Sequence, residues 1–187
     1  MFKRMVLIAL LGVFSSVSLN AKSLLRDDGI LVSDLKGMKS ELSDAPAWVF
    51  EDPKVPYEEM GVAYIPVNNK YLGIEQATLN AKLSLIVVFH EIMLKYKKRF
   101  MEQFHESEQT ATNISYAIYN YLATKIQVAY TYTNLKSEVA VVKIKLVGCQ
   151  IEQIKRYLKG VENLNDNEIA YIAKVAQKEF GSVCALR

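Results

Sequence analysis

The residues of this chain that could do catalytic chemistry are few and widely spaced. His90 and Glu91 begin like the helical motif of a zinc protease, but that motif needs a second histidine four residues after the first, and position 94 is leucine. The other histidine, His105, lies about 22 Å further along a helix, too far away to share a metal ion. We therefore expect no metal site and no cofactor.

The short motifs that mark common enzyme classes are also missing from the sequence. It contains no glycine-rich phosphate loop, no Gly-x-Ser-x-Gly elbow and no Cys-x-x-Cys pair. The adjacent carboxylates Asp27 and Asp28, and likewise Glu58 and Glu59, fall in expected loops, where no apolar pocket would tune them for acid-base catalysis. The sequence predicts a protein that is not an enzyme.

Cys149 and Cys184 are the two cysteines of the chain. In an oxidising compartment, a disulfide between them would tie the C-terminal tail to the end of the last strand. The alternative is a pair of unpaired thiols in separate places. The distance between the two Cα atoms decides the matter, so the sequence leaves both alternatives open.

A run of positive charge comprises Lys95, Lys97, Lys98 and Arg99. These side chains could bind the phosphate groups of lipid or nucleic acid as an anionic-surface patch. Alternatively, they are a solvated helix end, where cations also interact favourably with the helix dipole. Because Lys95 and Arg99 share one helix face while Lys97 and Lys98 point elsewhere, we favour the solvated helix end.

A long helix, expected over residues 74–104, must position most of these groups. Apolar residues recur along it at steps of three and four, and a second apolar stripe leaves its middle apolar nearly all round. At 1.5 Å per residue the helix would be a rod about 45 Å long, so a sheet or a partner chain must cover it. The candidate contacts with a partner are Ile86, Phe89 and Met93.

Shorter elements complete a predicted α+β fold, in which an antiparallel three-stranded sheet lies on the long helix. They are a strand over residues 60–65, a helix over 113–125, hairpin strands over 127–133 and 138–147, a helix over 151–159, and a last helix from Asn165. Asn165 and Glu168 have the spacing of an N-cap residue and its reciprocal acid.

The alternation within the hairpin assigns residues to the two faces of the sheet. Val128, Tyr130 and Tyr132 should share one face, and Lys143 and Lys145 should point outward. Tyrosine is concentrated over residues 116–132, and we expect these side chains in the core rather than at an interface.

Residues 1–21 have the composition of a secretory signal peptide, with a basic start, an apolar run and a small residue at the exit. We predict cleavage after Ala21; a membrane anchor is the alternative, although the apolar run is short for a span. The remaining chain would carry a net charge of about +1, which argues neither for nor against nucleic acid.

The mature chain is predicted to form one domain that follows an N-terminal tether with one weak amphipathic helix. Residues 22–45 are expected to be an N-terminal tether, residues 46–148 the β-α-α-β-β domain and residues 149–187 the C-terminal helices. Trp48 is the only tryptophan and stands in an extended, proline-bounded segment, so we expect it to dock that segment onto the domain.

Several short segments resemble the membrane-associated LPP-type lipoproteins of epsilon-proteobacteria. They are Ala45-Pro46-Ala47-Trp48-Val49, then Gly61-Val62-Ala63, then Ala77 and Ala81 on the long helix. The hairpin and the helix that follows extend the resemblance over residues 46–160. The resemblance implies a dodecin-like fold with a sheet packed on a long helix. The family also includes FlgP-like and FlgQ-like flagellar proteins and relatives of TNF-alpha-inducing protein.

Two departures from the family modify what the resemblance implies. Family lipoproteins carry a lipidated cysteine at the signal exit, where this chain has Lys22, and their long helix is less apolar than residues 83–89 here. The resemblance implies a structural or assembly protein of the periplasm and outer membrane, a FlgQ-like accessory of the flagellar motor disk. Its partners would be a lipidated paralogue and further copies of itself, with peripheral outer-membrane contact and no nucleic acid. The alternative is a secreted effector or adhesin that acts on host cells.

Overall fold

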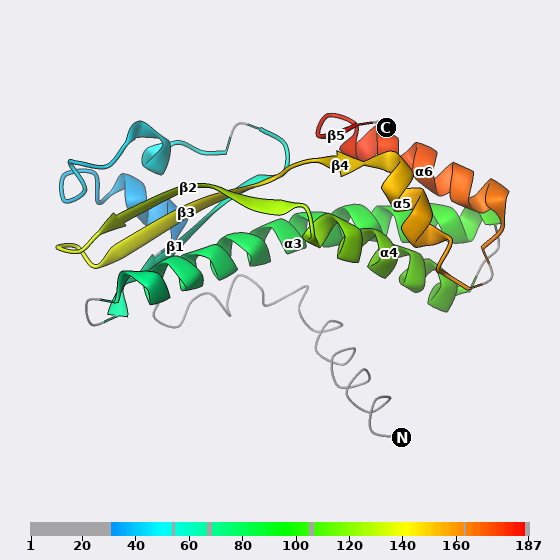
Figure 1. Cartoon of the computed structure of the whole chain (residues 1–187), viewed down its shortest axis with the longest axis horizontal. Coiled ribbons are helices and arrows are strands. Elements are labelled where there is room, and N and C mark those ends of the chain that lie inside the picture. Colours follow the sequence, from blue (N-terminus) through cyan, green and yellow to red (C-terminus); the bar gives the residue numbers. More distant parts are fainter. Residues whose placement is uncertain (1–30, 54, 67–68, 105–106, 163, 186–187) are drawn as a thin grey trace, which may run out of the picture.

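The structure is a computed structural model that describes residues 31–53, 55–66, 69–104, 107–162 and 164–185 (Figure 1). The predicted signal peptide, the first residues of the predicted tether and His105 lie outside the described residues.

Helix α3 (Lys70–Phe104) runs the length of the described molecule and confirms the predicted long helix, which begins four residues earlier than expected (Figure 1). Its buried side chains recur at every fourth position, from Ala77 through Leu85 to Met93. Four residues turn a helix by about 400°, so this line moves about 40° around the helix at each step. The first half of α3 therefore faces the sheet, while the second half faces α4 (Glu108–Ala123) and α6 (Asp166–Phe180).

The sheet has the order β1-β3-β2, with β1 (Glu58–Tyr64), β3 (Val139–Leu146) and β2 (Ile126–Asn134) all antiparallel. This arrangement confirms the α+β class and the predicted hairpin. Strand β1 begins at Glu58, so Glu58 and Glu59 lie in the sheet rather than in the predicted loop. Any side chain at Gly61 would collide with the backbone of Ala77 and Ala81, so glycine is what allows α3 to lie directly on β1.

A β-bulge in β2 corrects the predicted faces of the hairpin. Val128 pairs with Ile144, but the next paired residue is Tyr130, opposite Lys143, and Ala129 has no partner on β3. An extra residue in one strand moves every later side chain to the other face. Val128 therefore lies on the α3 side of the sheet, while Tyr130 and Tyr132 lie on the opposite side, so the prediction that the three share a face is wrong.

The shorter helices cover the second half of α3. Helix α4 begins at Glu108, five residues before the predicted start, because the side chain of Ser107 caps it by accepting a hydrogen bond from the Thr110 N–H, 3.1 Å away. Helix α6 begins at the predicted cap, where Asn165 and Glu168 form the expected capping box. Helix α5 (Ile151–Leu158) and the two-stranded pair β4 (Cys149–Gln150) and β5 (Cys184–Ala185) complete this half.

Residues 31–50 form a strap over the face of the sheet that α3 leaves free, which differs from the predicted tether. The strap contains two short 3-10 helices, η1 (Val32–Lys36) and η2 (Ala47–Phe50). Leu35, Leu42 and Val49 are fully buried and pack with Met60, Val62, Val139 and Val141 of the sheet in a separate outer core. Trp48 stacks on Tyr130 at 5.6 Å between ring centroids, which confirms the predicted docking of this segment.

Lys143, which was predicted to point outward, lies on the strap side of the sheet and does not reach open solvent. Its side chain is 7% exposed, with the Nζ atom 3.6 Å from Oε2 of Glu58 and 5.8 Å from the centre of the Trp48 ring. Lys145 is exposed. The expectation for Lys143 is wrong because the strap covers it.

Candidate functional site

The described residues that were considered for catalysis lie on different elements, with His90 and Glu91 on α3 and with Glu58 and Glu59 on β1. His90 is exposed on α3, on the side away from the sheet, and His105 lies outside the described residues. Within the residues that the structure describes, no group of three His, Cys, Asp or Glu side chains could hold a metal ion. The features that remain are packing surfaces, a groove and a disulfide.

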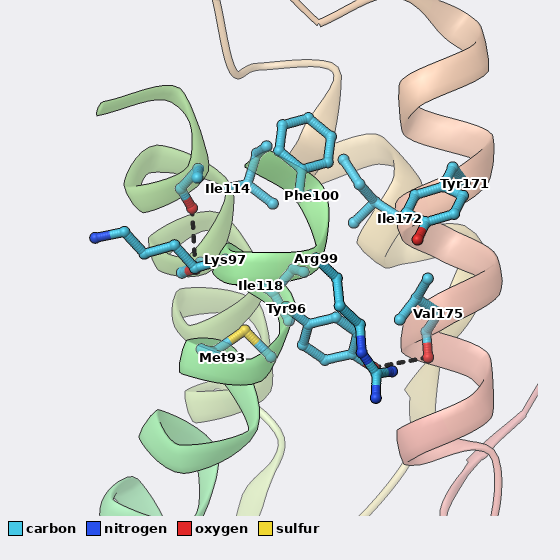
Figure 2. Close-up of a pocket in the computed structure, with 12 residues that line it drawn as sticks. Met93, Tyr96, Lys97, Arg99, Phe100, Ile114, Ile118, Tyr171, Ile172 and Val175 are labelled. Atoms are coloured by element: carbon cyan, nitrogen blue, oxygen red, sulfur yellow. Dashed lines mark hydrogen bonds between the residues drawn. The ribbon is translucent and has the colours of Figure 1, made fainter. Parts of the chain in front are cut away.

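The crevice where α3, α4 and α6 meet is filled by side chains (Figure 2). Its cavity is only about 20 Å³, enough for about one water molecule. Tyr96 crosses from α3 and donates a hydrogen bond from its hydroxyl to the Val175 carbonyl of α6, 2.7 Å away. Burial raises the pKa of the Tyr96 hydroxyl, with the nearby Glu179 carboxylate acting in the same direction. The crevice therefore holds α6 in place and offers no room for a ligand.

The side of α3 opposite the sheet carries a row of exposed apolar residues, which we call the α3 stripe. Its members are Leu72, Leu79, Leu83, Val87 and Leu94, each between 38% and 50% exposed. Three of them, Leu79, Leu83 and Val87, lie midway between buried residues of the sheet-facing line. Two residues turn a helix by about 200°, so these three point directly away from the sheet.

A groove of about 140 Å³ between α3 and α4 continues the α3 stripe. It is lined by apolar and hydroxyl-bearing side chains together with one imidazole and one ammonium group: Ile86, His90, Met93, Leu94, Lys97, Thr112, Ser115, Tyr116 and Tyr119. Tyr116 on its α4 side is 37% exposed, whereas Tyr121 on the same helix is buried and accepts a hydrogen bond from the Gln150 N–H at 2.7 Å. The expectation that tyrosines lie in the core holds for Tyr121 and fails for Tyr116 and Tyr130, of which Tyr130 is 53% exposed.

The structure separates the three predicted partner contacts. Ile86 is half-buried and borders the groove, but Phe89 is fully buried and Met93 is 5% exposed. The prediction is therefore wrong for Phe89, which packs against Tyr57 and Phe180, and for Met93, which faces α4 and α6. Sequence reasoning missed Val87 and Leu94 as exposed residues. The steady four-residue spacing from Ala77 to Met93 was the signal that identifies the buried line, and hence the opposite face.

The run of positive charge divides around α3, as its helical spacing predicts. Nζ of Lys97 forms an ion pair with Glu108 of α4 at 2.6 Å, and its hydrogen bond lowers the pKa of the Glu108 carboxyl. Lys95, Lys98 and Arg99 are exposed. Arg99 borders a shallow depression with Lys174 and Lys178 of α6, which brings together cations that are far apart in the sequence.

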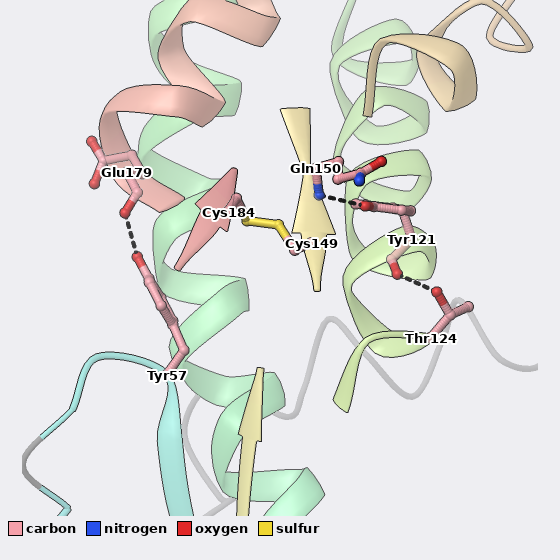
Figure 3. The surroundings of a disulfide bond; sticks show 7 residues. All are labelled: Tyr57, Tyr121, Thr124, Cys149, Gln150, Glu179 and Cys184. Atoms are coloured by element: carbon pink, nitrogen blue, oxygen red, sulfur yellow. Dashed lines mark hydrogen bonds between the residues drawn. A yellow bond between two sulfur atoms is a disulfide. The ribbon is translucent and has the colours of Figure 1, made fainter. Parts of the chain in front are cut away.

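Cys149 and Cys184 are joined by a disulfide, the first of the two predicted alternatives (Figure 3). Both are buried, and their Cα atoms lie 4.5 Å apart where β4 and β5 pair in parallel. Nearby, the Tyr57 hydroxyl donates a hydrogen bond to the Glu179 carbonyl at the end of α6, 2.7 Å away. The disulfide and this bond fix the C-terminal tail to the segments that follow β3 and precede β1.

One helix among the described residues, α3, is long and apolar enough to cross a membrane on length and composition alone. In this fold α3 lies along β1 and β3, and Gly61 brings its backbone against β1. A crossing would carry the open edges of the sheet into hydrocarbon, where their backbone groups would find no hydrogen-bond partners. The packing therefore favours α3 as a core helix with one exposed apolar face.

No protein-family model matches the chain, and no curated protein is found similar to it.

Proposed function

We propose that this protein is a non-enzymatic structural or assembly protein, which joins other subunits by packing a helix against the α3 stripe. The observation that carries the proposal is the stripe itself, which extends over about 33 Å from Leu72 to Leu94. Gln76 and His90 are exposed between members of the stripe, but five large apolar side chains exposed on one face of a helix still mark an interaction site more often than an accident of composition. A partner helix is the shape that covers such a row most completely.

The charges beside the α3 stripe favour a protein partner over a membrane surface. The exposed charged residues on its two sides include the acids Glu75 and Glu91 and the bases Lys82 and Lys98. A helix that lies on an anionic bilayer carries mainly lysine and arginine on its polar face. Mixed signs suit a partner helix with charges of both signs.

The groove between α3 and α4 supports the same proposal. Its volume of about 140 Å³ has room for a bulky apolar side chain from a partner, and its rim of hydroxyl groups and His90 could orient polar neighbours. Packed helices interlock in this way, when a side chain of one enters a hole formed by residues of the other.

The resemblance extends the proposal to a place in the cell and a fold family. We propose that the protein is exported, lies in the periplasm on the outer-membrane side, and serves as a FlgQ-like accessory of the flagellar motor disk. Its partners there would be a lipidated paralogue and further copies of itself. We also propose that the sheet and α3 are arranged as in dodecin-like proteins; a strand order that differed from theirs would argue against this detail.

Replacing the stripe leucines tests the partner proposal directly. Tagged protein would be purified from gently solubilised envelopes, and the proteins that come with it identified by mass spectrometry. Leu79→Glu combined with Leu83→Glu should abolish recovery of the partners. Leu135→Glu is the matched control, because Leu135 is equally exposed but lies in the hairpin turn. Equal recovery by all three proteins would refute the role of the α3 stripe.

The flagellar part of the proposal is tested in a strain without the gene. Loss of motility, with a motor disk that is absent or incomplete in images of the cell envelope, is the expected result. Normal motility and an intact disk would refute the flagellar role and leave the partner proposal standing.

A second candidate function is that of a secreted effector or adhesin, and one observation favours it. Arg99, Lys174 and Lys178 gather beside one depression, which could bind an anionic group on a host cell. Mature protein found mainly in the culture supernatant of unlysed cells would favour this candidate. Retention in the cell envelope would argue against it.

A further inference from the structure

The two edges of the three-stranded sheet are built differently. In the order β1-β3-β2, strands β1 and β2 each have one side that no strand of the described chain pairs with. An open strand edge is a template for pairing with another chain, and soluble proteins usually block it with charge, proline, a bulge or a covering segment.

Strand β1 carries several of these blocking features. It starts with Glu58 and Glu59, follows Pro56 and contains Gly61, which weakens a strand. The side-chain amide of Asn80 on α3 donates a hydrogen bond to the Val62 carbonyl, 2.8 Å away, so one backbone acceptor of the strand is already occupied. This edge is poorly suited to pairing.

Strand β2 lacks nearly all of the features that block an open edge. Its nine residues, Ile126–Asn134, include no charged residue, no proline and no glycine, and alternate β-branched and aromatic residues over Tyr130-Thr131-Tyr132-Thr133. Val128 is 50% exposed and Tyr130 is 53% exposed. Within the described ranges, no backbone group outside the hairpin bonds to the strand itself. The bulge at Ala129 is its one interruption, and the four residues after it are regular.

The residues after the bulge are complementary to a reversed copy of themselves. With two β2 strands antiparallel about Thr131, each Tyr130 faces the other copy's Tyr132, and the two Thr131 residues face each other. Tyr–Tyr and Thr–Thr neighbours are among the favourable cross-strand pairs. Because the strand carries no charge, its own side chains add no like-charge repulsion to this approach.

We propose that β2 pairs with the β2 of a second copy of this chain, antiparallel about a two-fold axis at Thr131, to form one continuous six-stranded sheet. A two-fold interface needs a self-complementary surface, and the Tyr-Thr alternation provides it. This interface is separate from the α3 stripe, which lies on the far side of α3 from the sheet. An experiment that refutes one of the two interfaces therefore leaves the other standing.

A cysteine at the two-fold axis tests the register. Opposed residues of antiparallel strands have Cα atoms about 4.5–5.5 Å apart, which is within disulfide range. Thr131→Cys should give a disulfide-linked dimer under mild oxidation, since the two native cysteines are already bonded to each other. Leu135→Cys, exposed in the adjacent turn, should remain largely monomeric on a reducing-agent-free gel. Equal cross-linking of the two variants, or none of either, would overturn the register.

Sedimentation of the full mature chain tests the interface without cross-linking. The Leu79→Glu, Leu83→Glu protein serves as the background, so that any remaining dimer does not depend on the α3 stripe. Adding Val128→Lys, a charge of the type that blocks natural edges, should weaken the dimer at least about tenfold. Adding Val55→Lys, at an equally exposed valine in the loop before β1, should leave it unchanged.

Two outcomes would overturn the proposal. One is a background protein that is monomeric at every concentration tested while its circular dichroism remains that of the wild type. The other is slow hydrogen exchange, in a monomer, of those β2 amides that point away from β3, which would mean that the chain itself covers the edge.

Discussion

The two faces of the sheet are covered in different ways, and strand β3 contributes to both. Its residues Ala140, Val142 and Ile144 enter the main core under α3, whereas Val139 and Val141 enter the outer core under the strap. The main core is built from long helices and is closed by a disulfide. The outer core is built from an irregular segment held by side-chain contacts. The two faces of the sheet therefore differ in the element that covers them. We expect the strap and the helices of the main core to detach from the sheet under different conditions.

Removal of a large side chain from the main core should have the largest effect. Phe89 is fully buried and contacts the rings of Tyr57 and Phe180, so Phe89→Ala leaves a cavity where β1, α3 and α6 meet. We expect the free energy of unfolding to fall by about 3–5 kcal/mol. Chemical denaturation followed by circular dichroism measures it. Val87→Ala, two residues away on the exposed face, should change it by less than about 0.5 kcal/mol.

Loss of the disulfide should have the next largest effect. Cys149 and Cys184 are 35 residues apart, and the bond between them restricts the unfolded chain. Replacing both with serine should lower the free energy of unfolding by about 2–4 kcal/mol. Trp48 fluorescence in the native protein should stay the same, because the strap lies at the other end of the sheet. A changed native spectrum would show that the two covers are coupled.

A cavity in the outer core should loosen the strap without unfolding the domain. Leu42 is a fully buried residue of the strap that packs against the sheet, and Leu42→Ala should cost about 2–3 kcal/mol locally. Trp48, the only tryptophan, should then report a transition at lower denaturant than circular dichroism does. Leu31→Ala, at an exposed leucine of the same segment, should leave the two transitions together. Coincident transitions in Leu42→Ala would contradict the separation of the two cores.

Acid should weaken one attachment of the strap by a smaller amount. The Asp44 carboxylate accepts hydrogen bonds from the Tyr132 hydroxyl at 2.8 Å and the Asn134 amide at 3.1 Å, and the bond from Tyr132 is the main reason that its pKa is lowered. A group with a lowered pKa stabilises the fold above its unfolded pKa, and this contribution is lost as the pH falls through the folded pKa.

The change should therefore appear below about pH 4, as a small shift in Trp48 fluorescence that precedes any loss of helix. Asp44→Asn should remove this step, and Asp166→Asn, on α6, should retain it. A shift that persists in Asp44→Asn would assign the acid sensitivity to another group.

The main core could be predicted from the sequence because its elements are periodic. The spacing of apolar residues gave α3 and α6, and Asn165 with Glu168 gave the start of α6 to the residue. The strap could not be predicted in the same way. Its buried residues Leu35, Leu42 and Val49 are seven residues apart, a spacing that would indicate an α-helix, whereas they lie on turns and 3-10 helices. The bulge at Ala129 was not predicted either, because the alternation of residue types along the strand does not reveal an extra residue.

The candidate surfaces were predictable only in part. The sequence showed that α3 is apolar on more than one side, but the burial of Phe89 and Met93 depended on where α4 and α6 lie, which is a tertiary fact. The depression that joins Arg99 to Lys174 and Lys178 brings together residues 75 or more positions apart, which periodicity within one element does not reveal.

The length of α3 has a consequence for any assembly that this protein forms. At 1.5 Å per residue its 35 residues make a strut of about 52 Å, which joins the sheet end of the molecule to the end that holds α4 and α6. The distance between two partner subunits bound at different points along α3 would be set by the number of helix residues between those points. An insertion of seven residues would lengthen the spacing by about 10 Å and turn the outward face by only about 20°. An insertion of five would turn it by about 140°. The number of residues in α3 therefore sets the distance between bound neighbours, and only changes of about seven residues keep its outward face in the same direction.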